Sequence, residues 1–332
     1  MNNIFLLVMC SFLAGCGTTK NADSSLSCSI SPIVYDPDHI LYGPWAKKSV
    51  LKGGLSGAQI FKVIKGKTTY VWRQITNRNM TDRVREINAQ VTASRSGYGP
   101  KLYAYDAHTG VILMEALEAC DHHISATLRL QALAHALKTM HSGPAFCAHM
   151  PLQEQTKVLV KTTPRPLSSA QKRHIHAILE TQRSFKDTLK TATHRDLNPN
   201  NIFVTQNGVK FIDFENAGLD DPYIDLAAVS LFYMMTHQEQ TLLLSAYHGR
   251  RITEDDMVHL QWARRLVCVF QGLTLHQIAH ARAPRENAPQ PLRSALDLGT
   301  ALTRVYEGKL VPTRSQDVRC VADAFLKEAL NK

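Results

Sequence analysis

Two short segments of the chain carry residue types that could do chemistry together. The first contains His194, Arg195 and Asp196 in a row and then Asn201, and the second is centred on Asp213. An aspartate can accept the proton of an attacking hydroxyl group, and aspartate and asparagine oxygens are hard ligands suited to Mg²⁺. The pattern predicts metal-assisted phosphoryl transfer, with Asp196 as the base and with Asn201 and Asp213 as the metal ligands.

The chain between these segments is predicted to form a β-hairpin. Residues 201–205 and 209–213 read as strands, and Asn207-Gly208 between them is a strong turn signal. A hairpin would bring Asn201 and Asp213 together, so that one metal site could use both. His194 belongs to the same catalytic segment, where a histidine most often supports the loop by hydrogen bonding.

Residues that could hold a nucleotide lie upstream of these segments. A glycine-rich turn contains Gly54, Ser56 and Gly57, and small residues let backbone N–H groups approach phosphates closely. Arg73 follows on a predicted strand and is the cation expected to meet the α- and β-phosphates through its bidentate fork. Glu86 lies on the helix predicted over residues 82–94 and could pair with Arg73.

With these pieces in order, the chain resembles the aminoglycoside phosphotransferase/choline kinase superfamily, and most closely its kinases for choline, ethanolamine and thiamine. The resemblance covers roughly residues 45–300 and is carried by segments 53–57, 71–73, 137–141, 194–201, 211–218 and 221–227. It implies an α+β, bilobal protein-kinase-like fold with a small β-rich N-lobe and a larger, mostly helical C-lobe. It also implies ATP and Mg²⁺ as cofactors.

The resemblance further implies how the chain is divided. Residues 31–117 would form the N-lobe with its hinge, and residues 118–332 would form the C-lobe. Backbone groups from Glu115 to Leu117 would bind adenine at the hinge. Asp225 would brace the catalytic loop, and as a carboxylate at a predicted helix N-terminus it would also be stabilised by the helix dipole.

The residues that would bind the acceptor are less clearly marked. Gln271 and Thr274 align with two tryptophans of choline kinases, which bind a quaternary ammonium in an aromatic cage. Phe270 and Glu215 are our candidate acceptor-binding residues. A different cage could use four aromatic residues: Phe270, Trp262, Tyr233 and Tyr247. We expect a hydroxyl of a small cationic metabolite as the acceptor, with aminoglycosides as an alternative.

Composition is that of a globular protein with a sizeable core. The chain has 332 residues, 44% hydrophobic content and a net charge of +10, which suits one or two domains. Lysine and arginine are scattered and no nucleic-acid-binding motif occurs, so ATP and a small acceptor are the expected partners. Helices are predicted over residues 129–141, from 168 to about 190 and from 253 to about 283.

The N-terminus suggests a membrane anchor. An apolar run over residues 4–14 precedes Cys16 in a tetrapeptide, Leu-Ala-Gly-Cys, that resembles a bacterial lipobox. The run is too short to span a bilayer as a helix, and residues 1–30 would be a signal segment and tether. This predicts lipidation of Cys16 and a membrane-anchored bacterial lipoprotein, with a cytoplasmic enzyme as the alternative.

Two observations favour that alternative. ATP is scarce outside the bacterial cytoplasm, and the five cysteines beyond Cys16 are odd in number and widely spaced. Such a set predicts neither a disulfide framework nor a zinc site.

A second functional hypothesis keeps the lipobox and gives up the activity: a catalytically silent, kinase-like envelope lipoprotein that binds a ligand. Protein kinase activity is less expected, because little room for an activation loop remains between Asp213 and Asp221.

Overall fold

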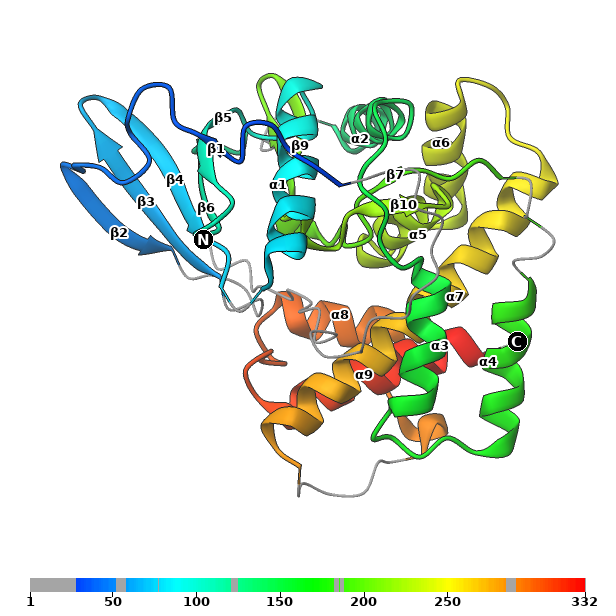
Figure 1. The fold of residues 1–332 in the computed structure, drawn as a ribbon. Coiled ribbons are helices and arrows are strands. Elements are labelled where there is room, and N and C mark those ends of the chain that lie inside the picture. The colour runs from blue at the N-terminus through cyan, green and yellow to red at the C-terminus, as the bar shows by residue number, and fades with distance from the viewer. Residues whose placement is uncertain are drawn as a thin grey trace.

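The computed structural model describes residues 28–51, 58–76, 78–120, 125–181, 185, 188–284 and 291–331. These residues form a smaller lobe built around a sheet and a larger lobe built from helices (Figure 1). The predicted α+β, bilobal arrangement of a small β-rich lobe and a larger, mostly helical lobe is confirmed. Four residues with predicted roles lie outside the described residues: Cys16, Gly54, Ser56 and Gly57.

The N-lobe contains a six-stranded antiparallel sheet in the order β1-β5-β6-β4-β3-β2. Its strands are β1 (Val34–Tyr35), β2 (Lys47–Leu51), β3 (Gln59–Lys65), β4 (Thr68–Gln74), β5 (Leu102–Asp106) and β6 (Val111–Glu115). Successive side chains of β4 alternate between the two faces of the sheet. Val71 packs into the cluster that includes Ile87 of α1, whereas Trp72 packs into the opposite cluster. The same alternation puts Arg73 on the face that meets α1.

Helix α1 (Met80–Arg95) lies between the sheet and the C-lobe (Figure 1). It begins two positions before the predicted Asp82, because the side chain of Asn79 caps it by accepting a hydrogen bond from the Asp82 N–H. Val84 and Ile87 are buried against the sheet. Glu86 is also buried, which is unusual for a glutamate without a charged partner.

The C-lobe packs its helices around one large hydrophobic cluster. The helices are α2 (Ala126–His141), α3 (Leu152–Thr162), α4 (Ser169–Thr181), α5 (Tyr223–Phe232), α6 (His237–His248), α7 (Glu254–Arg282), α8 (Leu298–Tyr306) and α9 (Ser315–Leu330). Helix α2 starts earlier than predicted, at its cap Ser125. Helix α4 ends at Thr181 rather than near Lys190. None of the described helices is both long enough and apolar enough to cross a bilayer.

Short strands and turns carry the predicted catalytic segments into this lobe. Strands β8 (Ile202–Thr205) and β9 (Gly208–Phe211) form the predicted hairpin, and Gly208 takes a positive φ of 101° at its turn. The antiparallel pair β7 (Thr191–Thr193) and β10 (Gly218–Asp220) flanks it in sequence. The 3₁₀ turns η3 (Pro199–Asn201) and η4 (Phe214–Asn216) complete the segment.

A disulfide joins Cys28 to Cys147. The cysteine count, which predicted no disulfide framework, did not indicate this single bond. The two cysteines are 119 residues apart and meet only because the N-terminal segment packs beside the C-lobe, which cysteine counting cannot reveal. Cys120, Cys268 and Cys320 are free thiols.

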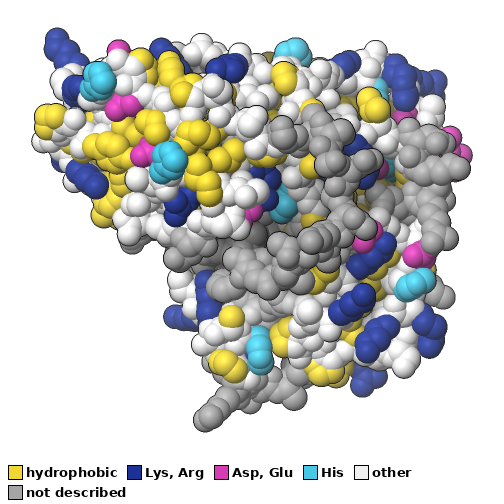
Figure 2. All heavy atoms as spheres, viewed as in Figure 1, with side chains coloured by type: hydrophobic (Ala, Val, Ile, Leu, Met, Phe, Trp, Pro, Cys, Tyr) yellow, Lys and Arg dark blue, Asp and Glu magenta, His cyan; other side chains and the backbone are white. Residues whose placement is uncertain are grey.

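The surface charge is dispersed on the face seen in Figure 2, where lysine and arginine side chains are scattered over both lobes. Hydrophobic side chains gather on the N-lobe side of that view. Exposed large hydrophobic residues of this lobe include Tyr42 and Val50. Among the described residues on this face, the basic side chains do not form the continuous stripe that typically binds nucleic acid.

Close packing of α7 against α9 provides a first prediction. A Cβ atom on Gly272 would lie 2.9 Å from the Ala322 carbonyl oxygen and 2.7 Å from Leu326 Cγ. We expect Gly272→Val to lower the free energy of unfolding by about 1–3 kcal/mol, because the helices must separate. The matched Gly299→Val, whose nearest neighbouring atom is 3.5 Å away, should stay within about 0.5 kcal/mol. Urea unfolding curves that coincide for the two variants would contradict this packing.

Candidate active site

The buried carboxylate of Asp225 holds the backbone of the catalytic loop, which we define as residues 194–201. Its oxygens accept hydrogen bonds from the backbone N–H groups of His194 at 2.8 Å and Arg195 at 2.7 Å. The ring of His141 contributes a third contact at 3.1 Å. Burial alone would raise the pKa of Asp225, but the hydrogen bond and charge of His141 and the backbone hydrogen bond from His194 outweigh it and lower the pKa. The ionised carboxylate therefore fixes the loop, including Arg195 at its positive φ of 66°.

His194 connects the catalytic loop to the Asp213 segment. Its Nε2 atom donates to the carbonyl oxygen of Ile212 at 2.9 Å, and its ring lies 4.8 Å from that of Phe214. Burial lowers the pKa of the imidazole, so it is neutral at physiological pH. These contacts give His194 a supporting position inside the loop.

Asp196 is buried and held by two amides. The side chain of Asn198 donates to Asp196 Oδ1 at 3.2 Å, and that of Asn201 donates to the Asp196 carbonyl at 2.8 Å and to Oδ2 at 3.3 Å. Burial raises the pKa of Asp196 well above its ordinary value, and the charges of Asp213 and Glu215 raise it further. A carboxylate with a raised pKa binds a proton more tightly, as a general base requires.

The hairpin brings Asn201 and Asp213 to one site, since the Ile212 N–H donates to the Asn201 carbonyl at 3.0 Å. Both residues line the same cavity between the lobes. The amide nitrogen of Asn201 is used by Asp196, which leaves its amide oxygen for another partner. A carboxylate and an amide oxygen beside room for phosphate oxygens form a donor set that suits Mg²⁺.

Arg73 joins the two lobes at this site. Its guanidinium forms ion pairs with Glu86 of α1 and, at 2.7 Å, with Asp213 of the C-lobe. Burial works against the charged form, but Glu86 and Asp213 outweigh it and raise the pKa of Arg73 above its ordinary value. The pair with Glu86 follows the sequence prediction. The contact with Asp213 was not predicted, because it depends on how the lobes pack.

A cavity of about 740 Å³ extends from these charges along the cleft. Apolar side chains of Ile60 and Val71 line it from the N-lobe, and those of Phe203 and Ile212 line it from the C-lobe hairpin. Two such surfaces can enclose a flat aromatic base. The cavity also includes Glu115 and Leu117 of the predicted hinge.

One backbone group of the predicted hinge already has a partner within the N-lobe. The Glu115 N–H donates to the Lys101 carbonyl at 2.8 Å, and the Glu115 carboxylate accepts from the Lys101 N–H at 2.9 Å. Glu115 is thus tied to the start of β5, because strand pairing continues to the end of β6. Its N–H is therefore not available to a base, and adenine binding by the other backbone groups of Glu115 to Leu117 stays a prediction.

A family model of the phosphotransferase enzyme family matches residues 49–259 of the chain. The chain belongs to this family. The matched range includes Arg73, Glu86, the catalytic loop, Asp213 and Asp225. No curated protein is similar enough in sequence to count as a match.

Solved structures share the fold of this phosphotransferase at low sequence identity. A choline/ethanolamine kinase family protein from Mesorhizobium loti has a TM-score of 0.60 and 16% identity, over 86% of this chain and 93% of its own. Choline kinase from Streptococcus pneumoniae has a TM-score of 0.57 and 20% identity, over 78% and 93%. Spectinomycin phosphotransferase, solved with ADP and spectinomycin, has a TM-score of 0.50 and 11% identity, over 86% and 94%.

Neither candidate acceptor-binding residue of the phosphotransferase is among the residues that line the 740 Å³ cavity. Glu215 is buried and pairs with Arg78 at 2.7 Å. Burial, followed by the charge of Asp213, raises the pKa of Glu215 to about 8, although Arg78 acts in the opposite direction. Phe270 packs against the C-lobe core from α7. Their role in acceptor binding stays a prediction.

Two of the four residues of the alternative aromatic cage make hydrogen bonds within the C-lobe. The indole of Trp262 donates to the Ile178 carbonyl at 2.9 Å, and the hydroxyl of Tyr247 bonds to His141 at 2.9 Å. Both side chains are therefore part of the C-lobe interior. In the described part of the chain, the buried atoms Gln271 Oε1 and Thr274 Oγ1 have no hydrogen-bond partner, so α7 carries two unsatisfied polar side chains.

Two residues of the site were missed by our sequence analysis. Arg78 pairs with Glu215 across the lobes, and nothing in its local sequence marks it. His141 supports Asp225 from the end of α2. A signal for His141 did exist, because residues 137–141 carry part of the family resemblance.

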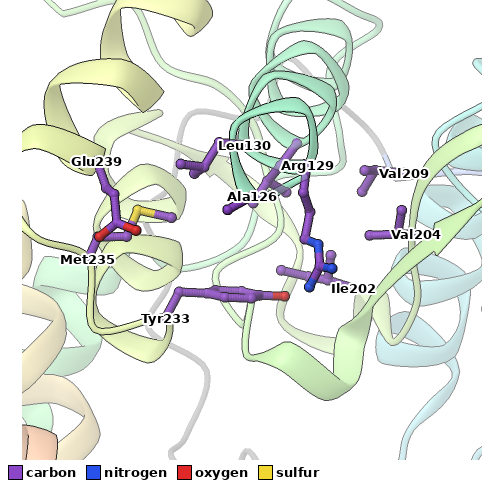
Figure 3. Close-up of a pocket in the computed structure, with 10 residues that line it drawn as sticks. Ala126, Arg129, Leu130, Ile202, Val204, Val209, Tyr233, Met235 and Glu239 are labelled. Atoms are coloured by element: carbon purple, nitrogen blue, oxygen red, sulfur yellow. The ribbon is translucent and has the colours of Figure 1, made fainter. Parts of the chain in front are cut away.

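A smaller cavity of about 210 Å³ lies beside the same hairpin (Figure 3). Its wall is mostly apolar and includes Leu130, Ile202 and Val204, and the side chains of Arg129 and Tyr233 point toward each other across it. None of the predicted catalytic or metal-binding residues lines it. We therefore assign the chemistry to the larger cavity.

The support that Asp225 gives to the catalytic loop predicts a pH-dependent stability. At neutral pH, Asp225→Asn should lower the free energy of unfolding by about 3–5 kcal/mol, because one partner of a buried charged network is lost. The folded-state pKa of Asp225 is depressed. Its stabilisation is thus present above the unfolded pKa of about 4 and is lost as the pH falls through the lower folded value.

We therefore expect the difference in the free energy of unfolding between wild type and Asp225→Asn, measured by urea unfolding across pH, to shrink below about pH 4. Asp255→Asn, at an exposed position on α7, serves as the control and should change little at any pH. A difference for Asp225→Asn that stays constant down to acid unfolding would show that its charge does not support the loop.

Proposed function

We propose that this phosphotransferase transfers the γ-phosphoryl group of ATP to a hydroxyl of a small cationic metabolite of the choline, ethanolamine or thiamine type. The observation that carries the proposal is that Arg73, Asn201 and Asp213 line one cavity between the lobes while Asp196 is hydrogen-bonded to Asn201 beside it. A general base, two metal ligands and a cation that can bind phosphates are thus present together. In such transfers catalysis consists mostly of positioning and electrostatic stabilisation.

Each side chain has a task in this proposal. Asp196 accepts the proton of the acceptor hydroxyl while Asn198 and Asn201 hold its carboxylate in place. Arg73 binds the α- and β-phosphates, and Glu86 keeps its guanidinium oriented. Asn201 and Asp213 would hold Mg²⁺, which neutralises charge on the phosphates. Leu117 of the hinge would contact the base.

The acceptor class rests on the sequence resemblance and on the choline and ethanolamine kinases among proteins of similar fold. An aminoglycoside acceptor is the alternative within the same chemistry, since spectinomycin phosphotransferase shares the fold. A panel of acceptors separates these possibilities directly.

We further propose that the protein is a lipoprotein anchored through Cys16. The lipobox-like tetrapeptide supports this, and so does the Cys28–Cys147 disulfide, because disulfides persist mainly in oxidising compartments. ATP is scarce there, and this favours a second candidate function: a silent relative that binds a ligand at the envelope. The intact catalytic set supports the enzyme over this candidate.

Turnover by the purified full chain tests the proposed function. We expect Mg²⁺-dependent ATP consumption with one member of a panel of choline, ethanolamine, thiamine, amino sugars and aminoglycosides. Asp196→Ala should lower kcat by roughly 10²–10⁴-fold, because the general base is lost. Asp255→Ala on the surface of α7 is the matched control and should retain full activity. No turnover with any acceptor, or equal turnover in Asp196→Ala, would contradict the proposal.

A further inference from the structure

We infer that the Cys28–Cys147 disulfide positions the phosphoryl-transfer site by fastening α1, which carries Glu86, to the C-lobe loop that supports the catalytic segments. This loop comprises residues 142–151 and is called the α2–α3 loop below. The inference rests on the proposed function, because it assigns the disulfide to the placement of Arg73 and its partners.

The first half of the disulfide is attached to α1. Cys28 packs against the hydrophobic cluster that contains Val84 and Ile87 of this helix. The next residue, Ser29, accepts a hydrogen bond at its carbonyl from the Asn88 side chain at 3.1 Å. Ile30 is buried in the same cluster. The segment then continues past α1 to β1 (Figure 1). Because of these contacts, fixing the position of Cys28 also restrains the helix.

The second half is attached to the catalytic segments. One residue before Cys147, the ring of Phe146 lies 6.0 Å from that of Phe214, which directly follows Asp213. Further along the α2–α3 loop, the Met150 carbonyl accepts from Arg195 Nη1 at 3.0 Å. The loop thus contacts both the catalytic loop and the Asp213 segment, and Cys147 lies between these two contacts in the sequence.

The covalent bond therefore spans the same two bodies as the ion pairs of the active site. Arg73 links Glu86 of α1 to Asp213, and Arg78 links the start of α1 to Glu215. Ligand phosphates and a metal ion would compete with these ion pairs, whereas they would not break a covalent disulfide. With its Cα atoms 5.0 Å apart, the bond keeps α1 beside the C-lobe while the charges exchange partners.

Without the bond, we expect α1 to leave its active position for part of the time, which reduces the fraction of molecules able to bind ATP. Cys28→Ser, Cys147→Ser and the double variant should each weaken Mg²⁺-ATP binding by about tenfold and to the same extent, because each removes the same bond. Hydrogen exchange in α1 should rise, while exchange in α9, which is remote in the C-lobe, should not. Cys120→Ser removes a free thiol and is the matched control.

The test uses the full chain purified without reductant and measures ATP affinity by calorimetry, exchange by mass spectrometry and turnover with the best acceptor. Folded disulfide-free variants with wild-type ATP affinity and wild-type exchange in α1 would overturn the inference and leave the bond a general stabiliser. Faster exchange in both α1 and α9 would overturn it equally, since the bond would then stabilise the whole fold.

If the variants do not fold, the native protein is treated with a dithiol, which transfers two electrons and two protons to yield the Cys28 and Cys147 thiols. A rise in α1 exchange that precedes any rise in α9, reversed by reoxidation, supports the inference, and simultaneous changes oppose it. Exchange does not require turnover. A wild type that neither binds nor uses ATP therefore refutes the proposed function, while α1 exchange still decides the role of the disulfide.

Discussion

Arg73 is held between two carboxylates that come from different lobes, Glu86 on α1 and Asp213 beyond the hairpin. Taking a guanidinium out of water costs several kcal/mol, which only well-placed opposite charges offset. Strand β4, helix α1 and the hairpin must therefore keep one mutual placement for this charge to remain paired. The arrangement of the lobes and the chemistry of the cleft thus depend on the same three side chains.

The same ion pairs neutralise the charges of the active site when no ligand is bound. Arg73 is the proposed partner of phosphates and Asp213 the proposed ligand of a metal ion, and until these arrive each neutralises the other. Asp225 has the complementary task below the cleft, where its charge organises the backbone of the catalytic loop. The Asp213 carboxylate is thus in an ion pair that a metal ion could replace, whereas the Asp225 carboxylate is buried and fixed in place.

Much of this site could be predicted because its parts are local. Asp196, Asn201 and Asp213 lie on one loop and one hairpin, so their spacing alone brings them together. The Arg78–Glu215 pair and the Cys28–Cys147 disulfide could not be predicted, because their partners are 137 and 119 residues apart and meet only through lobe packing. The aromatic cage could not be decided from the sequence for another reason: aromatic residues at helical spacing look alike in a core and in a binding site, and the structure places Trp262 in the core.

Calorimetric titration of the full chain with ATP, with and without Mg²⁺, tests the central claim most directly. If Asp213 and Arg73 exchange each other for a metal ion and phosphates, wild type should bind ATP tightly only with Mg²⁺. Asp213→Asn, which keeps the shape of the side chain, should lose that Mg²⁺ dependence. Equal ATP affinity with and without Mg²⁺ in wild type, or an unchanged Mg²⁺ dependence in Asp213→Asn, would contradict the account.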